Sequence, residues 1–228
     1  MNTEPTSPPS GLASPSCSGS LDLRLGCCMD LMREYPDKHF DLAIVDPPYG
    51  IGMSGGNVGY KGNNDLPRKE WDKEPPPPEY FAEMMRVSKN WIVWGANYLI
   101  EYLNSTPCVI VWDKNNSGNF ADCEIAFATF TTGAKIFKYT WNGMIQQNMK
   151  DKEERIHPTQ KPVALYEWLL KQYAKEGDLI LDTHVGSGSS RIACQKNGFS
   201  FVGFEIDKTY FEAQEARFKN FTAQLRLW

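Results

Sequence analysis

The sequence lacks the features of a membrane, secreted or zinc-binding protein. It has no run of roughly eighteen apolar residues, so no transmembrane helix is expected. Its N-terminus has no basic patch followed by an apolar stretch, which a secretory signal requires. None of the six cysteines forms a Cys-x-x-Cys pair, which argues against zinc and against a disulfide framework. Reduced thiols in the cytoplasm are the expectation.

An excess of basic charge is also missing. The net charge is −4, whereas a DNA-binding protein typically concentrates Lys and Arg on one face. Only the stretch 135–161 has a basic bias, with six basic residues against three acidic ones. A solvated charged surface explains such a stretch as well as a nucleic-acid interface does.

The chain is long enough for one domain with a full core. Residues 1–20 are rich in Ser, Pro, Gly and Thr, and we expect a disordered tail there. From 21 to 228, strand and helix signals alternate, which predicts a single α/β domain with a mostly parallel sheet covered on both faces. Two strands, Glu124 to Phe130 and Lys135 to Tyr139, are expected to form an antiparallel edge hairpin. A helix is expected near Asn97 to Leu103.

One long loop interrupts this alternation. Residues 51–79 are too long for an idle connection, so a functional or mobile loop is expected. Its charged residues cancel, because four basic residues stand against four acidic ones: Lys61, Arg68, Lys69 and Lys73 against Asp65, Glu70, Asp72 and Glu74.

The stretch Leu179 to Ser190 predicts a strand, a tight glycine turn and the start of a helix. Gly186 and Gly188 let the backbone approach a ligand closely, and the helix start presents N–H groups. Glu205 ends the next strand, where a carboxylate can accept both hydroxyls of a ribose. Arg191 replaces the third glycine of the dinucleotide fingerprint. A ligand with a ribose and an adenine but no pyrophosphate therefore fits better, and S-adenosylmethionine is such a ligand. A plain Gly-Ser-Gly turn is the alternative.

A second motif, Asp46-Pro47-Pro48-Tyr49, follows the apolar run 42–45 at the carboxyl end of a predicted strand, where ligands gather in α/β sheets. Two prolines hold the backbone extended, so that the carbonyl of Pro47 and the carboxylate of Asp46 form a pair of fixed acceptors. Such a pair suits an NH₂ group, and Tyr49 can stack on a flat base. A strand-ending Pro-Pro turn with Asp46 as a cap is the alternative.

These acceptors match the chemistry of methylating an aromatic amine. The lone pair of such an amine is delocalised into the ring, so two acceptors orient the amine and favour a tetrahedral nitrogen. Asp46 can then take or relay the lost proton. A base inside a duplex cannot reach the pocket, so it has to be flipped out.

Together these motifs resemble the amino-methyltransferases that modify DNA bases, in the circularly permuted order called the beta group. The resemblance covers about 21–221 and implies an S-adenosylmethionine-dependent methyltransferase fold, Rossmann-like, with a seven-stranded sheet. It implies a catalytic half at about 21–145 around Asp46, Pro47, Pro48 and Tyr49, and a cofactor half at about 155–228. The residues it implies for the cofactor are His157, Thr159 and Lys161 at the methionine end, Asp182, His184, Gly186, Ser187, Gly188 and Ser189 in the loop, and Glu205 at the ribose.

Within that family an Asp at the first motif position is associated mostly with adenine and a Ser with cytosine. Asp46 therefore favours N6-methylation of a flipped adenine in DNA. This chain departs from the family pattern at Cys27, where an Asp is common, and at His184, where a Phe is common. It also has only about fifteen residues between Trp141 and His157, where relatives often carry a target-recognition region.

The short recognition segment leaves three ways to bind DNA: a homodimer, a separate recognition partner, or relaxed specificity. Small members of the family occur in phages and mobile elements. Two other functions stay open at this point. One is a methyltransferase acting on cytosine N4 or on RNA, and the other is a non-catalytic subunit that binds cofactor or DNA within a larger complex.

Overall fold

The structure, a computed structural model, describes residues 19–53, 70–116, 121–142 and 145–225. The tail expected over 1–20 falls almost entirely outside these ranges. So does most of the long loop expected over 51–79, including the basic residues Lys61, Arg68 and Lys69.

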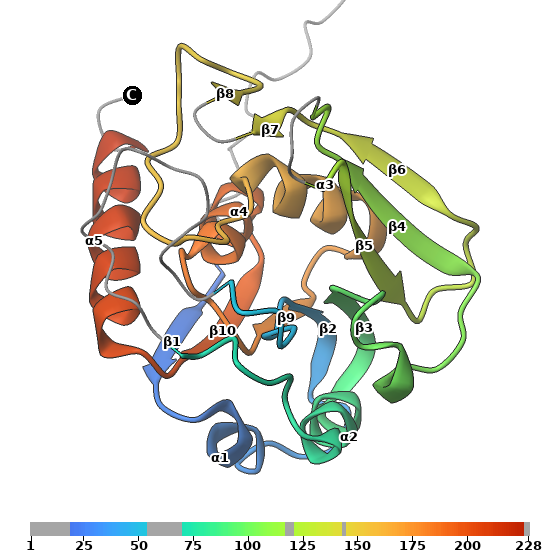
Figure 1. The fold of residues 1–228 in the computed structure, drawn as a ribbon. Helices are drawn as coiled ribbons and strands as arrows, with labels where there is room; N and C mark the ends of the chain where they lie inside the picture. Colours follow the sequence, from blue (N-terminus) through green and yellow to red (C-terminus); the bar gives the residue numbers. More distant parts are fainter. Residues whose placement is uncertain (1–18, 54–69, 117–120, 143–144, 226–228) are drawn as a thin grey trace, which may run out of the picture.

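Eight strands form one sheet in the order β1-β10-β9-β2-β3-β5-β4-β6, and two short strands, β7 and β8, pair separately (Figure 1). Strand β5 runs antiparallel to both of its neighbours, and every other pair in the large sheet is parallel. The bounds are β1 Leu21–Leu25, β2 Phe40–Val45, β3 Ser88–Trp94, β4 Cys108–Asp113, β5 Cys123–Ala128, β6 Lys135–Lys138, β7 Trp141–Asn142, β8 Ile145–Gln146, β9 Leu179–Asp182 and β10 Ser200–Glu205.

Helices cover both faces of the large sheet (Figure 1). Their bounds are α1 Cys28–Met32, α2 Pro78–Val87, η1 Ile100–Tyr102, α3 Val163–Tyr173, α4 Ser189–Asn197 and α5 Lys208–Leu225. None of the helices in the described ranges is both long and apolar enough to cross a bilayer. The predicted α/β architecture with a mostly parallel, doubly covered sheet is confirmed.

The burial of the central strand β2 explains why its residues 42–45 are all apolar. Leu42 and Ile44 pack into the core beneath α3 and α4, whereas Ala43 and Val45 pack into the core beneath α1 and α2. A strand buried on both faces needs apolar residues at every position. The chain then leaves the sheet at Asp46, directly above these two cores.

The expected antiparallel hairpin is present, but β4 and β5 form it, and the predicted pairing of Glu124–Phe130 with Lys135–Tyr139 is wrong. Strand β5 pairs with β4 and β3, and β6 crosses over to pair in parallel with β4. The antiparallel strand therefore lies inside the sheet, and the pairing of β4 with β6 makes eight strands where seven were expected. Strand β6 covers the backbone groups that β4 would otherwise expose at the edge.

The helix expected near Asn97 to Leu103 is reduced to the short 3₁₀ helix η1. Gly95 has a positive φ of 71°, and successive i to i+3 hydrogen bonds follow it, from Tyr98 N to the Gly95 carbonyl and from Leu99 N to the Ala96 carbonyl. The chain makes turns here because it has to pass close to Tyr49.

Replacing Ile92 by alanine tests the packing of the central sheet. Ile92 is fully buried on β3, so the free energy of unfolding should fall by about 2–5 kcal/mol through lost contacts and a cavity. Ile136→Ala is the matched control, because Ile136 is 62% exposed on the edge strand β6. It should change stability by less than about 0.5 kcal/mol in the same urea titration. Equal effects of the two changes would contradict the assigned core.

Candidate functional site

Four strands end at the same edge of the sheet and bring the two predicted motifs together. Strands β2, β9 and β10 are linked in parallel register, and β3 lies parallel to β2 on its other side. Asp46 follows β2, Gly95 follows β3, the glycine loop follows β9, and Glu205 ends β10. The carboxyl ends of parallel strands form the usual binding edge of such sheets.

A cluster of charges surrounds Asp46. Its Oδ2 lies 2.6 Å from Lys161 Nζ, and its Oδ1 accepts a hydrogen bond from the Tyr49 hydroxyl. The same ammonium lies 2.8 Å from Glu124 Oε2 and donates to the Tyr49 hydroxyl at 3.3 Å. Glu124 also pairs with Lys114 at 2.5 Å. Two carboxylates and two ammonium groups therefore balance in one small volume.

Burial makes this cluster sensitive to its pairing. The Lys161 side chain is 3% exposed and that of Asp46 is 16% exposed. Burial raises the pKa of Asp46, and the positive charge of Lys161 works against that rise. Burial also favours protonated Glu124, but Lys161 and Lys114 together lower the pKa of Glu124 to about 2. Burial and the neighbouring Asp46 raise the pKa of Tyr49 well above its usual value, so Tyr49 stays a neutral donor.

Asp72 holds the backbone that follows Asp46. One of its carboxylate oxygens accepts hydrogen bonds from the N–H groups of Tyr49 (2.7 Å) and Gly50 (2.9 Å), and the other accepts from Met53 (2.6 Å). The Asp72 side chain is almost completely buried. In the sequence, Asp72 was interpreted only as one of several charges that cancel within the loop 51–79. Its buried role corrects that interpretation.

Gly95 and Tyr98, which both follow β3, shape the surroundings of Tyr49. A Cβ atom at Gly95 would overlap the Tyr49 ring, so only glycine allows this close approach. Tyr98, on the following turn and about half exposed, stacks on Tyr49 with ring centroids 5.4 Å apart and an interplanar angle of 17°. The ring of Tyr49 is therefore held beside Asp46 and already has a flat partner.

The glycine loop between β9 and α4 is fixed by two carboxylates. Asp182 accepts hydrogen bonds from the His184 N–H (3.0 Å) and the Ser190 hydroxyl (2.6 Å). Glu205 Oε2 accepts the Gly186 N–H at 2.8 Å, and its Oε1 accepts the N–H of Asp207 at 2.8 Å. Gly186 and Gly188 both adopt positive φ, at 51° and 75°. The predicted tight turn is confirmed, and glycine adopts these positive φ values without steric cost.

Two groups in this loop have displaced pKa values because they are buried. Burial raises the pKa of Asp182 to about 7 and lowers the pKa of His184 to about 4. His184 is therefore uncharged at neutral pH. A hydrogen bond joins its Nδ1 to the Thr183 hydroxyl (3.0 Å), which in turn pairs with the Tyr80 hydroxyl (2.6 Å).

The segment 157–162 divides between the two parts of the site. The His157 ring lies beside the glycine loop, because a Cβ atom at Gly186 would be 3.6 Å from it, and a hydrogen bond at 3.2 Å joins His157 Nδ1 to the Thr159 hydroxyl. Lys161 instead extends to Asp46 and Glu124. The resemblance grouped Lys161 with His157 and Thr159 as cofactor residues, whereas its contacts here are with the Asp46 cluster.

Arg217 on α5 ties the same segment to the loop. It donates to the Ser187 carbonyl (2.7 Å) and the Ser189 hydroxyl (3.0 Å), and it pairs with Glu153 at 2.6 Å. Glu153 also accepts the Val163 N–H at 3.0 Å, at the start of α3. Ser187 and Ser189 are thus held from behind by a buried cation.

Four residues of the site carry no motif in the sequence: Asp72, Gly95, Glu124 and Arg217. Glu124 has a weak signal, because it is a carboxylate on an otherwise apolar strand. The other three act through contacts with residues far away in the chain, which spacing alone does not reveal.

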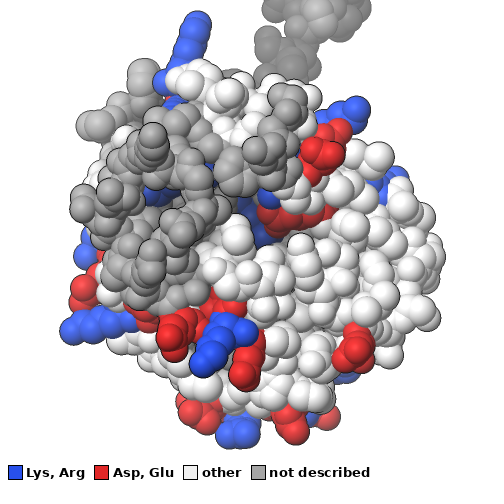
Figure 2. All heavy atoms as spheres, in the orientation of Figure 1, with Lys and Arg blue, Asp and Glu red and all other residues white. Residues whose placement is uncertain are grey.

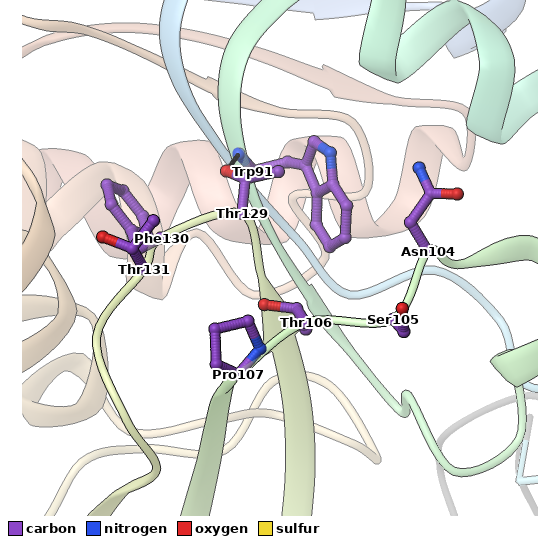
Figure 3. Close-up of a pocket in the computed structure, with 8 residues that line it drawn as sticks. All are labelled: Trp91, Asn104, Ser105, Thr106, Pro107, Thr129, Phe130 and Thr131. Atoms are coloured by element: carbon purple, nitrogen blue, oxygen red, sulfur yellow. Dashed lines mark hydrogen bonds between the residues drawn. The ribbon is translucent and has the colours of Figure 1, made fainter.

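A separate pocket of about 200 Å³ lies elsewhere, lined by Trp91, Asn104, Ser105, Thr106, Pro107, Thr129, Phe130 and Thr131 (Figure 3). Pro107 precedes β4 and Thr129 follows the antiparallel β5, so the pocket is at the opposite edge of the sheet from Asp46. Its lining carries no charged side chain. Among the described residues, no group of three or more His, Cys, Asp or Glu could hold a metal ion.

Known proteins are similar to this chain in both sequence and fold. A family model described as DNA methylase matches residues 111–216. The type II methyltransferase M2.DpnII of Streptococcus pneumoniae is 26% identical, over 79% of this chain and 82% of its own.

Two solved structures share the fold. The complex of M1.HpyAVI with SAM is 20% identical and has a TM-score of 0.56, over 87% of this chain and 98% of its own. The cytosine-N4-specific PvuII DNA methyltransferase is 12% identical with a TM-score of 0.60, over 88% and 87%.

Asp72→Ala should loosen the segment after Asp46. Three backbone N–H groups would lose their acceptor, and each buried donor left unsatisfied costs about 1–3 kcal/mol unless the segment opens to water. We expect a lower free energy of unfolding together with faster proteolytic cleavage near residue 50. Asp30→Ala removes the same charge from a well-exposed side chain on α1. It should leave the free energy of unfolding within about 0.5 kcal/mol of the parent and the cleavage rate unchanged. Unchanged proteolysis in Asp72→Ala would contradict the anchoring role.

Proposed function

We infer that this chain belongs to the DNA methylase family and transfers a methyl group from S-adenosylmethionine to the N6 amine of an adenine in DNA. The observation that carries this proposal is the buried Asp46 carboxylate at the end of β2, which already accepts an N–H donor, from Lys161 at 2.6 Å. A site in which a carboxylate binds one nitrogen donor beside an aromatic ring suits the amine of a flat base.

The residues of the described site fit the cofactor. Each oxygen of the Glu205 carboxylate accepts one backbone N–H, and a carboxylate oxygen has room for a second donor. Both oxygens can therefore accept the two hydroxyls of a ribose. The three described atoms nearest to the place of a Cβ atom at Gly186 all belong to the His157 ring, at 3.6–3.7 Å, so no described group presses tightly on the loop backbone there. We propose that His157, Thr159, Asp182, Ser187, Gly188 and Ser189 border the methionine end.

His184 would pack over the cofactor as an uncharged ring. Burial lowers the pKa of His184 to about 4, so the ring is neutral at pH 7. This neutrality explains how a histidine can stand where a phenylalanine is common in the family. When bound, S-adenosylmethionine supplies an electrophilic methyl group whose bond to sulfur breaks with the electron pair staying on sulfur.

The protein's task in the reaction is to orient the amine and remove a proton. Asp46 and the Pro47 carbonyl hold the two N–H groups, so that the nitrogen lone pair points out of the ring plane toward the methyl group. Asp46 takes the proton that the nitrogen loses as the N–C bond forms. Pro48 keeps the strand end extended, and Tyr49 stacks on the base after the base has left the duplex.

DNA recognition would draw on little of the described surface. On the face in Figure 2 the described Lys and Arg side chains are interspersed with Asp and Glu and form no single basic patch. Phosphate contacts supply most of the affinity for DNA. We propose that a second copy of the chain or a separate partner adds the remaining contacts to the duplex.

Transfer of tritiated methyl groups to unmethylated DNA, followed by nucleoside analysis, tests the function. The expected product is N6-methyladenine. Label in N4-methylcytosine would change the target base and keep the mechanism. No label in DNA, despite measurable cofactor binding, would contradict the proposal and favour an RNA enzyme or a non-catalytic subunit.

Asp46→Ala should abolish transfer and leave the cofactor site intact. General acid–base groups contribute about 10²–10⁴ to rates, so single-turnover transfer should fall at least that far. Calorimetric binding of S-adenosylmethionine should remain within about threefold, because Glu205 and the glycine loop are untouched. Asp41→Ala on the same strand, at the opposite end of β2, is the control for a lost carboxylate. Near-normal transfer by Asp46→Ala would show that the assigned role is wrong.

A further inference from the structure

Lys161 occupies the acceptor that the proposed reaction needs. Both Asp46 oxygens are engaged, Oδ1 by the Tyr49 hydroxyl and Oδ2 by the Lys161 ammonium. An ammonium group resembles the target amine in offering only N–H donors. A base amine that binds Asp46 Oδ2 therefore has to compete with the chain's own lysine.

Glu124 offers Lys161 a second position. Its Oε2 lies 2.8 Å from the same Nζ, so the ammonium already bridges two carboxylates. Lys114 pairs with the other oxygen of Glu124 at 2.5 Å and holds that carboxylate in place. With a pKa lowered to about 2, Glu124 is charged throughout the working pH range. The lysine can thus leave Asp46 without losing its counter-ion in a buried place, which would otherwise be costly.

The aromatic surroundings favour the same small movement. Lys161 Nζ lies 5.6 Å from the centroid of the Trp94 ring and 5.8 Å from that of Tyr49. The Trp94 ring at this distance stabilises a cation without fixing it to one oxygen atom, whereas Lys161 meets Tyr49 at its hydroxyl, 3.3 Å away. An ammonium on a flexible stem can shift between two carboxylates while it remains against these rings.

We propose that Lys161 is a place-holder for the target amine: it bridges Asp46 and Glu124 in the free enzyme and shifts onto Glu124 when the base amine binds Asp46. This inference rests on the proposed methyl transfer to DNA. It makes Lys161 a positioning residue of the catalytic carboxylate and Glu124 the residue that receives its charge.

The place-holder has a second effect on Asp46. Burial and the charge of Glu124 favour protonated Asp46, and the charge of Lys161 opposes them. The titratable groups that face Asp46 from the surrounding elements are Lys161, Glu124, Tyr49, Tyr80, Tyr166 and Asp182. Lys161 is the cation of this set. Without Lys161 the pKa of Asp46 rises. As the pH falls, Asp46 is then protonated at a higher pH and no longer accepts the amine's hydrogen bond.

Three variants test the proposal: Lys161→Met, Glu124→Gln and the double variant, each compared with the parent. The measurements are the affinity for S-adenosylmethionine by calorimetry, kcat and KM for unmethylated DNA, and the pH dependence of kcat. Circular dichroism and thermal unfolding show first that each variant folds. If the parent transfers no methyl group to DNA, the proposed function fails and this inference falls with it, before any variant is compared.

Lys161→Met should bind S-adenosylmethionine within about twofold of the parent and should not raise KM for DNA. The acidic limb of its pH profile of kcat should move to higher pH by about one to three units. The reason is that a neighbouring cation lowers a carboxyl pKa by that much, and Asp46 loses this cation in the variant. Glu124→Gln should raise KM for DNA at least about tenfold, since Lys161 then has no second carboxylate and stays on Asp46. The double variant should recover most of that KM, because no cation competes for Asp46.

The proposal is overturned if Lys161→Met weakens S-adenosylmethionine binding tenfold or more with an unmoved pH profile. Lys161 would then be a cofactor ligand, as the resemblance implied. It is also overturned if Glu124→Gln leaves KM unchanged, or if the double variant is no better than Glu124→Gln. The last result would mean that Glu124 supports the fold and receives no charge.

Discussion

The ion pair between Asp46 and Lys161 joins two parts of the chain that are 115 residues apart in sequence. Asp46 ends the first central strand, and Lys161 lies in the segment that leads into the helix before the cofactor loop. Both side chains are largely buried, so Asp46 depends on the charge of Lys161, and Lys161 depends on a carboxylate partner, either Asp46 or Glu124. The pair therefore fixes the relative position of the half that would bind the base and the half that would bind the cofactor.

Sheet order makes that pair geometrically possible. Strands β2 and β9 are neighbours with parallel register, so the chain emerges from both at the same edge. The two motifs are distant in sequence, because one follows β2 and the other follows β9. They are adjacent in space because these two strands pair in parallel. Around the pair, Asp72 accepts hydrogen bonds from the backbone after Asp46, and Arg217 links the glycine loop to Glu153, which lies before the segment that carries Lys161. Each support comes from a buried charge with several hydrogen bonds.

The sequence was sufficient to predict the parts that depend on local pattern. The run 42–45 predicted the end of a strand, the alternation of strands and helices predicted a sheet covered on both faces, and Gly186 and Gly188 predicted a tight turn; the structure confirms all three. The pairing of β6 was missed because a short turn between two extended segments normally indicates a hairpin, and only tertiary packing determines that β6 crosses to β4. Glu124 and Asp72 were missed for a similar reason. Each is a single charged residue whose partners are distant in sequence, so its role becomes visible only after folding.

The most direct test of this account is a crystal structure of the enzyme with a non-reactive cofactor analogue and a DNA duplex that contains its mapped target base. The account predicts that the exocyclic amine of the flipped base lies within hydrogen-bond distance of Asp46 and the Pro47 carbonyl, with Lys161 Nζ moved onto Glu124. A structure in which Lys161 remains on Asp46 while the amine binds elsewhere, or in which Lys161 binds the carboxylate of the cofactor analogue, would contradict it.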